Sequence, residues 1–237
     1  MTQRTVPGDV YGWPGRPWDL WTWLGLARRS GLHSPHRMLA GENISSPPVV
    51  CEHQSVSAGP EFVRPPRGHK GPIHLAPPDP GWPQQYAVVA ARIKQALGSV
   101  AVVVEHVGST SVPGLAAKPF LDVLLLVPEP SDEAAYVPGL EAAGFLLHVR
   151  EPDWHQHRFL RAHDPEVQIH VFAVDSEEAE RMLLFRDRLR VNGDERALYE
   201  ETKRRLAARS WTRVQDYADA KSEVVEEVIA RARAARA

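Results

Sequence analysis

The hydrophobic pattern of this chain becomes regular only after residue 80, and from there it predicts both helices and strands. Apolar residues at helical spacing from Trp82 onward predict an amphipathic helix that ends near Gly98. The apolar runs at 100–107 and 120–127 predict strands joined by a small-residue turn with a short helix. The other expected elements are a helix ending at Gly144, strands near 156–162 and 167–174, and helices at 176–191, 194–209 and 213–235.

This succession of a helix, strands and then helices favours one fold class. A chain of 237 residues has room for one sizeable domain with an extension. We therefore expect an α+β domain in which a mixed β-sheet is packed against helices and followed by a helical C-terminal tail.

The segment before this domain has a different composition. Residues 1–80 hold 13 of the 21 prolines and four of the seven tryptophans, so neither a helix nor a strand can run far. We assign residues 1–72 to a disordered Pro/Trp-rich extension and 73–235 to the domain. A Trp-rich peptide that binds a partner is the alternative for the extension. On the first interpretation, deleting residues 1–70 leaves the unfolding midpoint unchanged.

Composition excludes several classes of protein. The one cysteine, Cys51, cannot form an intrachain disulfide and fits a reducing compartment. No apolar stretch approaches the roughly 18 residues that a membrane span requires. A net charge of −2 gives no general attraction for nucleic acid. We expect a soluble cytoplasmic protein, and the composition does not indicate its oligomeric state.

The strand at 120–127 contains the feature with the clearest chemical meaning. It is apolar on both faces except for Asp122, and a strand of this kind lies inside a covered sheet. An ionised carboxylate there costs several kcal/mol unless it is hydrogen-bonded or bound to a cation. The turn Gly108-Ser109-Thr110-Ser111 comes about a dozen residues earlier. Together they indicate a phosphate site that faces a metal ion or a general base.

The same residues carry a family resemblance. The run from Glu105 to Pro119, EHVGSTSVPGLAAKP, followed by Asp122, resembles the signature of the GrpB family, which is similar to the nucleotidyltransferase superfamily. The resemblance extends over about 73–235 and implies a small nucleotidyltransferase-like core with a helical tail. GrpB-like domains also occur fused to dephospho-CoA kinases, but Gly108 to Lys118 does not fit a Walker A motif. Kinase activity is therefore not implied.

The superfamily pattern is only partly present. Val107-Gly108-Ser109 supplies its hydrophobic–Gly–Ser element, but its acid–hydrophobic–acid triplet is interrupted by Leu124. The later strand that would carry a third acid offers Gln168 and His170. A two-metal site therefore lacks its partner carboxylates. One Mg²⁺ held by Asp122, substrate phosphates and His170 remains compatible with the sequence.

These considerations define a candidate site. We expect Asp122 and His170 to be catalytic, with Asp122 also the metal ligand. We expect the phosphate-binding residues to be Gly108, Ser109, Thr110, Lys118 and Lys221. Structural alternatives exist for each: the hydroxyls can cap a turn, Asp122 can be a buried hydrogen-bond acceptor, and Lys221 can extend past the core to solvent.

Two functions follow from this site. The first is a nucleotidyltransferase that acts on a nucleotide or another phosphorylated small molecule with Mg²⁺. The second is a non-catalytic nucleotide- or metabolite-binding module that has kept the phosphate site and lost the metal triad. Leu124 favours the second function, and Asp122 within an apolar strand favours the first.

Overall fold

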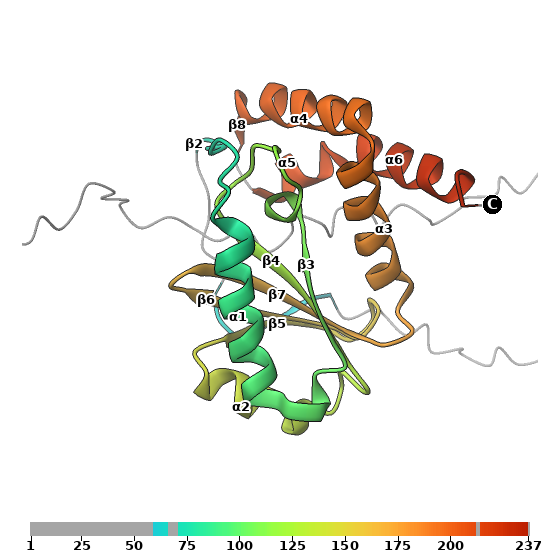
Figure 1. Cartoon of the computed structure of the whole chain (residues 1–237). Coiled ribbons are helices and arrows are strands. Elements are labelled where there is room, and N and C mark those ends of the chain that lie inside the picture. The colour runs from blue at the N-terminus through green and yellow to red at the C-terminus, as the bar shows by residue number, and fades with distance from the viewer. Residues whose placement is uncertain (1–58, 66–70, 212–213, 237) are drawn as a thin grey trace, which may run out of the picture.

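The computed structural model describes residues 59–65, 71–211 and 214–236, in which strands and helices are combined in one domain (Figure 1). The strands are β1 (Glu61–Phe62), β2 (Gly71–Pro72), β3 (Val103–Val107), β4 (Leu121–Val127), β5 (Leu146–Glu151), β6 (His157–His163), β7 (Glu166–Ala173) and β8 (Ser210–Trp211). The helices are α1 (Trp82–Leu97), α2 (Val137–Ala142), α3 (Glu177–Val191), α4 (Gly193–Ala207), α5 (Val214–Asp219) and α6 (Ser222–Ala234). Short 3-10 turns are η2 (Gly98–Val100), η3 (Ser109–Ser111) and η4 (Glu133–Ala135).

Six strands form one mixed sheet in the order β1-β5-β6-β7-β4-β3. The strands β4 and β7 run parallel, and the other neighbours in this sheet run antiparallel. The remaining strands, β2 and β8, form a separate antiparallel pair. The expected α+β class, a mixed sheet with packed helices and a helical C-terminal tail, is confirmed.

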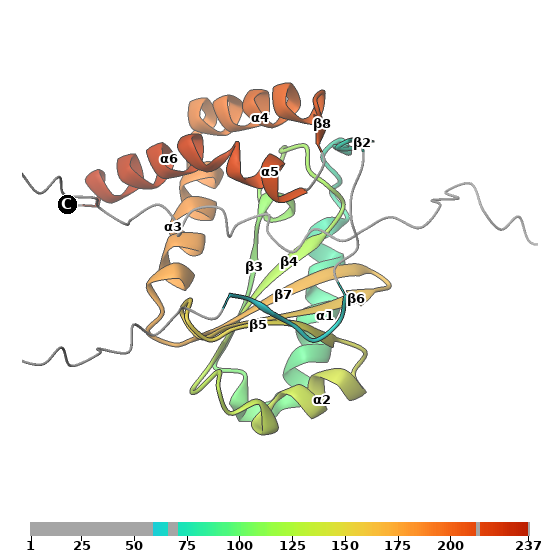
Figure 2. The ribbon, with the colours of Figure 1, turned by 180° about the vertical axis from the view of Figure 1, so that it is seen from behind.

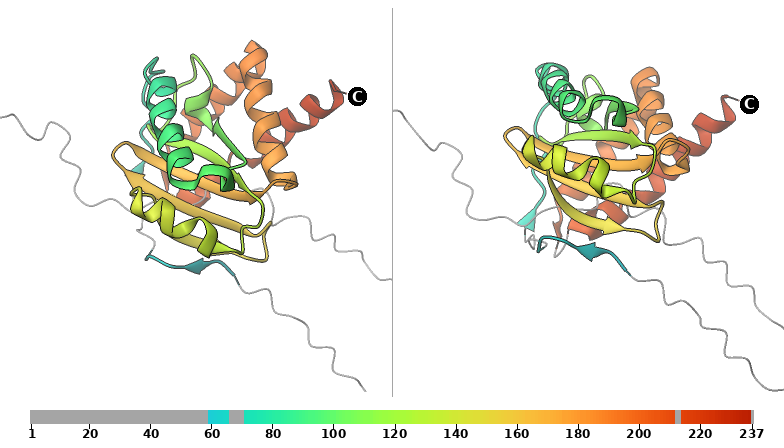
Figure 3. Two further views of the ribbon diagram at one scale, coloured as in Figure 1. Left: turned by 60° about the horizontal axis from the view of Figure 1, so that its bottom comes forward. Right: turned by 90° about the horizontal axis from the view of Figure 1, so that it is seen from below.

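The sheet lies between two layers of helices (Figures 1 and 3). Every residue of β4 is buried, and its side chains alternate between two hydrophobic cores. Alternate residues from Leu121 to Val127 pack in one core with α1 and α2, whereas Leu124 and Leu126 pack in the other with α3 and α6. This explains why β4 is apolar on both faces. Its one acid, Asp122, lies on the side of the sheet covered by α3 and α6.

Most expected elements match observed ones, but the closing helix does not. The helix expected at 213–235 is two helices, α5 and α6, with a break between residues 219 and 222. The apolar spacing continues across this point, so the hydrophobic pattern does not signal the break. The structure also adds strand β5. None of the helices in the described part of the chain is long and apolar enough to cross a membrane.

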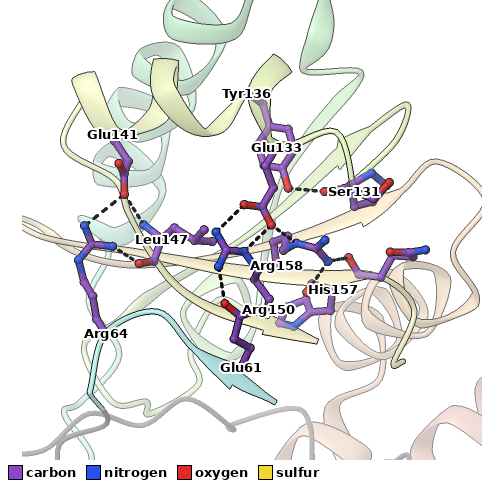
Figure 4. Close-up of polar contacts among 12 residues, drawn as sticks. Glu61, Arg64, Ser131, Glu133, Tyr136, Glu141, Leu147, Arg150, His157 and Arg158 are labelled. Atoms are coloured by element: carbon purple, nitrogen blue, oxygen red, sulfur yellow. Dashed lines mark hydrogen bonds and ion pairs between the residues drawn. The ribbon is translucent and has the colours of Figure 1, made fainter. Parts of the chain in front are cut away.

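Residues 59–65, which the sequence analysis assigned to the extension, lie at the edge of the sheet (Figure 4). Strand β1 pairs with β5, and Glu61 forms an ion pair of 2.7 Å with Arg150. Arg64 hydrogen-bonds to the carbonyl of Leu147 and forms an ion pair of 3.3 Å with Glu141. The edge strand therefore contributes contacts that a domain beginning at residue 73 would lack.

Two truncations should separate this edge from the rest of the extension. Removing residues 1–58 should leave the thermal midpoint unchanged. Removing residues 1–65 should cost about 1–2 kcal/mol, because it removes the β1 ladder and the hydrogen bond from Arg64. For a chain of this size that corresponds to a midpoint lower by roughly 2–8 °C. Equal midpoints for both truncated proteins would show that the edge strand adds no stability. A lower midpoint after removal of residues 1–58 alone would assign a stabilising role to those residues.

Candidate functional site

The turn after β3 is built around a glycine that no other residue could replace without strain. Gly108 has φ 69° and ψ −174°, a region that is essentially restricted to glycine. A Cβ atom at this position would lie 2.1 Å from Oδ2 of Asp122 and 2.8 Å from its Cβ. The backbone of the turn therefore lies directly against the acid of β4, as the sequence analysis expected for the Gly-Ser turn and Asp122.

The three hydroxyls of this turn have different neighbours. The Oγ of Ser109 accepts a hydrogen bond of 3.1 Å from Lys203, whereas the Oγ of Ser111 donates to the carbonyl of Gly108 at 2.6 Å. Thr110 is buried; its hydroxyl donates to the carbonyl of Phe120 at 3.0 Å and lies 3.0 Å from the Nε2 of His106. The hydroxyls of Thr110 and Ser111 thus hold the turn together, and Ser109 carries the hydroxyl that contacts a charged side chain.

Asp122 belongs to a row of polar residues across the sheet. Directly paired residues of neighbouring strands point to the same face. Asp122 pairs with Gln168 of β7, which pairs with Arg161 of β6, and all three side chains are buried. Val107 of β3 and Leu146 of β5 are the apolar neighbours at the two ends of the row. The row therefore combines an acid, an amide and a guanidinium beside the Gly108 turn.

Lys203 of α4 reaches this row from outside the sheet. Its side chain is 2% exposed, and its Nζ donates to Ser109 Oγ and, at 2.5 Å, to the carbonyl of Ala116. Burial lowers the pKa of Lys203 to about 7, against smaller opposing effects of the Glu200 and Asp122 carboxylates. Tyr199, one helical turn earlier, shares a hydrogen bond with Ser109, and its ring centroid lies 4.8 Å from the Lys203 Nζ.

The two lysines of the predicted site lie near one aromatic ring. The Nζ of Lys221 lies 4.6 Å from the ring centroid of Tyr217, and the Nζ of Lys118 lies 5.9 Å from the same centroid. Lys221 is 5% exposed, so its side chain does not extend to solvent. The ring of Phe120 lies 5.7 Å from Lys118 and 5.8 Å from the guanidinium carbon of Arg161. Together with Lys203, these residues bring basic groups of four separate segments to this end of the sheet. Figure 2 shows α4 and α5 at the end of the molecule where the loop from β3 to β4 lies.

His106 and His170 lie on opposite faces of the sheet. His170 pairs with Leu124, so it shares the face of Asp122 and lies two residues further along the strand. From standard strand spacings the two Cα atoms are about 8 Å apart. His106 points the other way, where its ring stacks on Tyr86 of α1 at 4.6 Å. Burial, together with Arg190 and Arg186, lowers the pKa of His106 to about 4.

The residues around Asp122 do not fit a two-metal centre. The neighbours of Asp122 in the row are the amide of Gln168 and the apolar Val107, and the Lys203 ammonium approaches from α4. Within the described residues, no group of three or more His, Cys, Asp or Glu side chains is arranged to hold a metal ion. A single Mg²⁺ on Asp122 stays a prediction. In that case Asp122 would hold the ion, and the ion would shield phosphate charge.

Arg186 of α3, another buried basic residue near the turn, is engaged by carboxylates. It bonds Glu105 and Asp187, each at 2.7 Å, and donates to the carbonyl of His106 at 3.1 Å. These contacts tie α3 to β3.

Sequence reasoning missed Lys203, Tyr199 and Arg161, although one signal was available. The spacing Tyr199-x-x-x-Lys203 is repeated as Tyr217-x-x-x-Lys221. In both cases the lysine is buried and lies within 5 Å of the tyrosine ring. A tyrosine and a lysine one turn apart, twice in the helical tail, could have indicated that both lysines face inward. For Arg161 the sequence offers no such signal.

The family of the protein follows from a comparison with known sequences. The family described as GrpB protein matches residues 72–231, which is more than half of the chain. The chain belongs to the GrpB family. A UPF0157 protein of Halalkalibacterium halodurans is 47% identical over 190 residues, which cover 80% of this chain and 95% of the relative. A UPF0157 protein of Streptomyces coelicolor is 45% identical over 164 residues, covering 69% and 86%.

Two further similarities place this GrpB domain among known proteins. The crystal structure of conserved protein GrpB from Enterococcus faecalis matches with a TM-score of 0.56 and 28% identity, covering 67% of this chain and 96% of that one. A dephospho-CoA kinase of Mycolicibacterium paratuberculosis is 34% identical over 169 residues. That match covers 60% of this chain but 41% of the kinase. The family resemblance carried by the Glu105–Pro119 signature is thereby confirmed, and these matches establish no particular catalytic activity.

Proposed function

We propose that this GrpB protein binds the phosphate groups of a nucleotide or a similar phosphorylated small molecule between the Gly108 turn and the helical tail. The observation that carries the proposal is the burial of Lys203. Its ammonium donates to Ser109 Oγ and to the Ala116 carbonyl, and both of these oxygens are uncharged. A buried ammonium is costly unless it is compensated. An anionic ligand beside Ser109 would compensate it.

The chemistry of the neighbouring residues favours phosphate as that anion. Lys118, Arg161 and Lys221 lie around the same end of the sheet, held by the rings of Phe120 and Tyr217. Several cations from different segments suit a group with more than one negative charge, and hydrogen bonds between charged partners are roughly twice as strong as neutral ones. Lys118 is partly exposed, which fits a ligand that enters from solvent beside it.

A nucleotidyltransferase reaction is the second candidate. It is favoured by His170 and Asp122, which share one face of the sheet at a diagonal spacing that one ligand could bridge. Leu124 pairs directly with His170 on the same face and supplies no carboxylate. Binding therefore has more support than transfer, and we derive no reaction step through a metal ion.

A thermal-shift experiment with ATP and inorganic tripolyphosphate tests the proposal. In EDTA, both should raise the unfolding midpoint, because the cations of the site are the protein's own. A ligand at about 100 times its Kd contributes roughly 2.7 kcal/mol. That corresponds to roughly 5–11 °C for a chain of this size. If neither probe shifts the midpoint, with or without Mg²⁺, the proposed phosphate site is wrong.

The variant Asp122→Asn tests the predicted magnesium site in the same assay. Without Mg²⁺ it should bind the probes as well as the unchanged protein or better, because a carboxylate that repels phosphate is gone. Any additional stabilisation by Mg²⁺ should disappear in this variant. Asp175→Asn is the matched control, since Asp175 is exposed. A loss of about 2 kcal/mol or more of ligand-free stability in Asp122→Asn would instead identify Asp122 as a structural acceptor.

A further inference from the structure

A chain of three buried side chains crosses the sheet on the same face as Asp122. The carboxylate of Glu151 lies 3.0 Å from Nδ1 of His157, and Nε2 of His157 lies 3.2 Å from Nδ1 of His170. The residues come from β5, β6 and β7, and they are 4%, 0% and 1% exposed respectively. None of the sequence-based functions accounts for this chain as a unit.

The direction of these hydrogen bonds follows from the chemistry of the groups. With Glu151 taken as ionised at neutral pH, its carboxylate can only accept, so Nδ1 of His157 carries the hydrogen that Glu151 accepts. In neutral His157 the other nitrogen, Nε2, is then an acceptor, and Nδ1 of His170 must donate to it. Burial lowers the pKa of His157 to about 3 and that of His170 well below its ordinary value. Both rings are therefore neutral, and the proton of His170 is on Nδ1.

This arrangement leaves Nε2 of His170 as a buried lone pair. The atom has no hydrogen-bond partner among the residues that the structure describes. His157 lies on the side of His170 that is further from Asp122, because its neighbour Arg158 pairs with Val171. Nδ1 of His170 is therefore turned away from the row of Asp122, Gln168 and Arg161. A buried acceptor without a donor is uncommon and marks a place where a ligand group can bind.

We propose that Glu151 and His157 fix His170 as a hydrogen-bond acceptor for a sugar hydroxyl of the phosphorylated ligand. This inference rests on the proposed phosphate site and specifies its ligand as a nucleotide or nucleotide-like sugar phosphate. A hydroxyl is the donor that such a molecule carries near its phosphates. The separation of about 8 Å between the Cα atoms of Asp122 and His170 lets one ligand contact both. Glu151 and His157 are positioning residues, and His170 makes the contact.

The protonation pattern can be measured without any ligand. In ¹⁵N-edited NMR spectra of the full-length protein at neutral pH, we expect His157 and His170 to be neutral with hydrogen on Nδ1. In Glu151→Gln the amide can donate as well as accept, so the proton of His170 should move partly to Nε2. A proton on Nε2 of His170 in the unchanged protein would overturn the inference. So would a spectrum of His170 that does not change in Glu151→Gln.

Three probes then separate this inference from the phosphate site itself. ATP should bind roughly tenfold more tightly than 2′,3′-dideoxy-ATP, as expected for one hydrogen bond of about 1 kcal/mol or slightly more, and His170→Phe should remove this difference. Tripolyphosphate should bind equally to His170→Phe and to the control His163→Phe, whose histidine is exposed.

Equal affinities for ATP and dideoxy-ATP would overturn the hydroxyl contact and leave the phosphate site standing. Failure of tripolyphosphate to bind would overturn the proposed function, while NMR would still decide the protonation of His170. Selective broadening of the His170 signal by Mn²⁺ would assign its lone pair to a metal ion instead.

Discussion

Replacing Lys203 with methionine should weaken the binding of ATP roughly 10- to 100-fold and, at the same time, stabilise the protein without ligand. The loss of affinity corresponds to one hydrogen bond with a charged group, about 1.5–3 kcal/mol. The gain in stability has a separate cause. The ammonium of Lys203 is 2% exposed and bonds two uncharged oxygens, so methionine removes a desolvation cost while filling similar space.

The stability that Lys203→Met gains without ligand should depend on pH in a defined direction. The pKa of Lys203 falls from an ordinary 10.5 to about 7 in the folded protein. Between these values the unfolded chain binds more protons than the native state, so native stability rises with pH from about 7 to about 10.5. Below pH 7 the full cost of the buried charge is present. Lys203→Met should lack this rise, and its advantage, on the order of 1–3 kcal/mol at pH 7, should shrink toward pH 10.

Urea unfolding at a series of pH values measures the stability, and calorimetric titration with ATP measures the affinity. Lys94→Met is the control, because Lys94 is exposed on α1 and should change neither quantity. Unchanged ATP affinity in Lys203→Met would remove the observation on which the phosphate site depends. A less stable ligand-free variant would mean that Lys203 is structural, since its two hydrogen bonds would then outweigh the cost of burying it.

The parts of the site that could be predicted are those encoded within one short segment. The Gly108-Ser109 turn and Asp122 lie close in sequence, and the apolar pattern of β4 identifies Asp122 as an exception. Most helices and strands could also be predicted, because the hydrophobic spacing that indicates each of them lies within one short segment. Local pattern and local chemistry agree here, so the turn and the acid meet as expected.

The parts that could not be predicted depend on how helices and strands pack against one another. Lys203 lies in a run of charged residues on α4 and reads as a surface lysine, yet it bonds Ser109 and Ala116, which lie 94 and 87 residues earlier in the chain. His157 meets Glu151 and His170 only because β5, β6 and β7 are neighbours in the sheet. Hydrophobic period fixes which elements form, but the register between strands decides which polar side chains meet.

Gly108→Ala should be among the most destabilising single substitutions in the domain, with an expected cost of roughly 3–5 kcal/mol. Two effects add. The backbone of Gly108, at φ 69° and ψ −174°, lies in a region that costs an alanine about 1–3 kcal/mol. The new methyl group would also overlap the side chain of Asp122, at 2.1 Å from Oδ2 and 2.8 Å from Cβ, and relief of such overpacking costs typically 1–3 kcal/mol.

Gly114→Ala separates these two effects. Gly114 lies in the same loop with φ 76°, but a Cβ atom there would have no neighbour within 4 Å. It should therefore show the backbone cost alone, about 1–2 kcal/mol. Urea unfolding of both variants gives the difference, which measures the contact between Gly108 and Asp122. Equal costs would show that Asp122 moves aside freely, and the acid would then not be held against the turn as the phosphate site requires. A large difference, together with loss of ATP binding in whatever fraction of Gly108→Ala remains folded, would show that the position of Asp122 against the turn matters for both stability and binding.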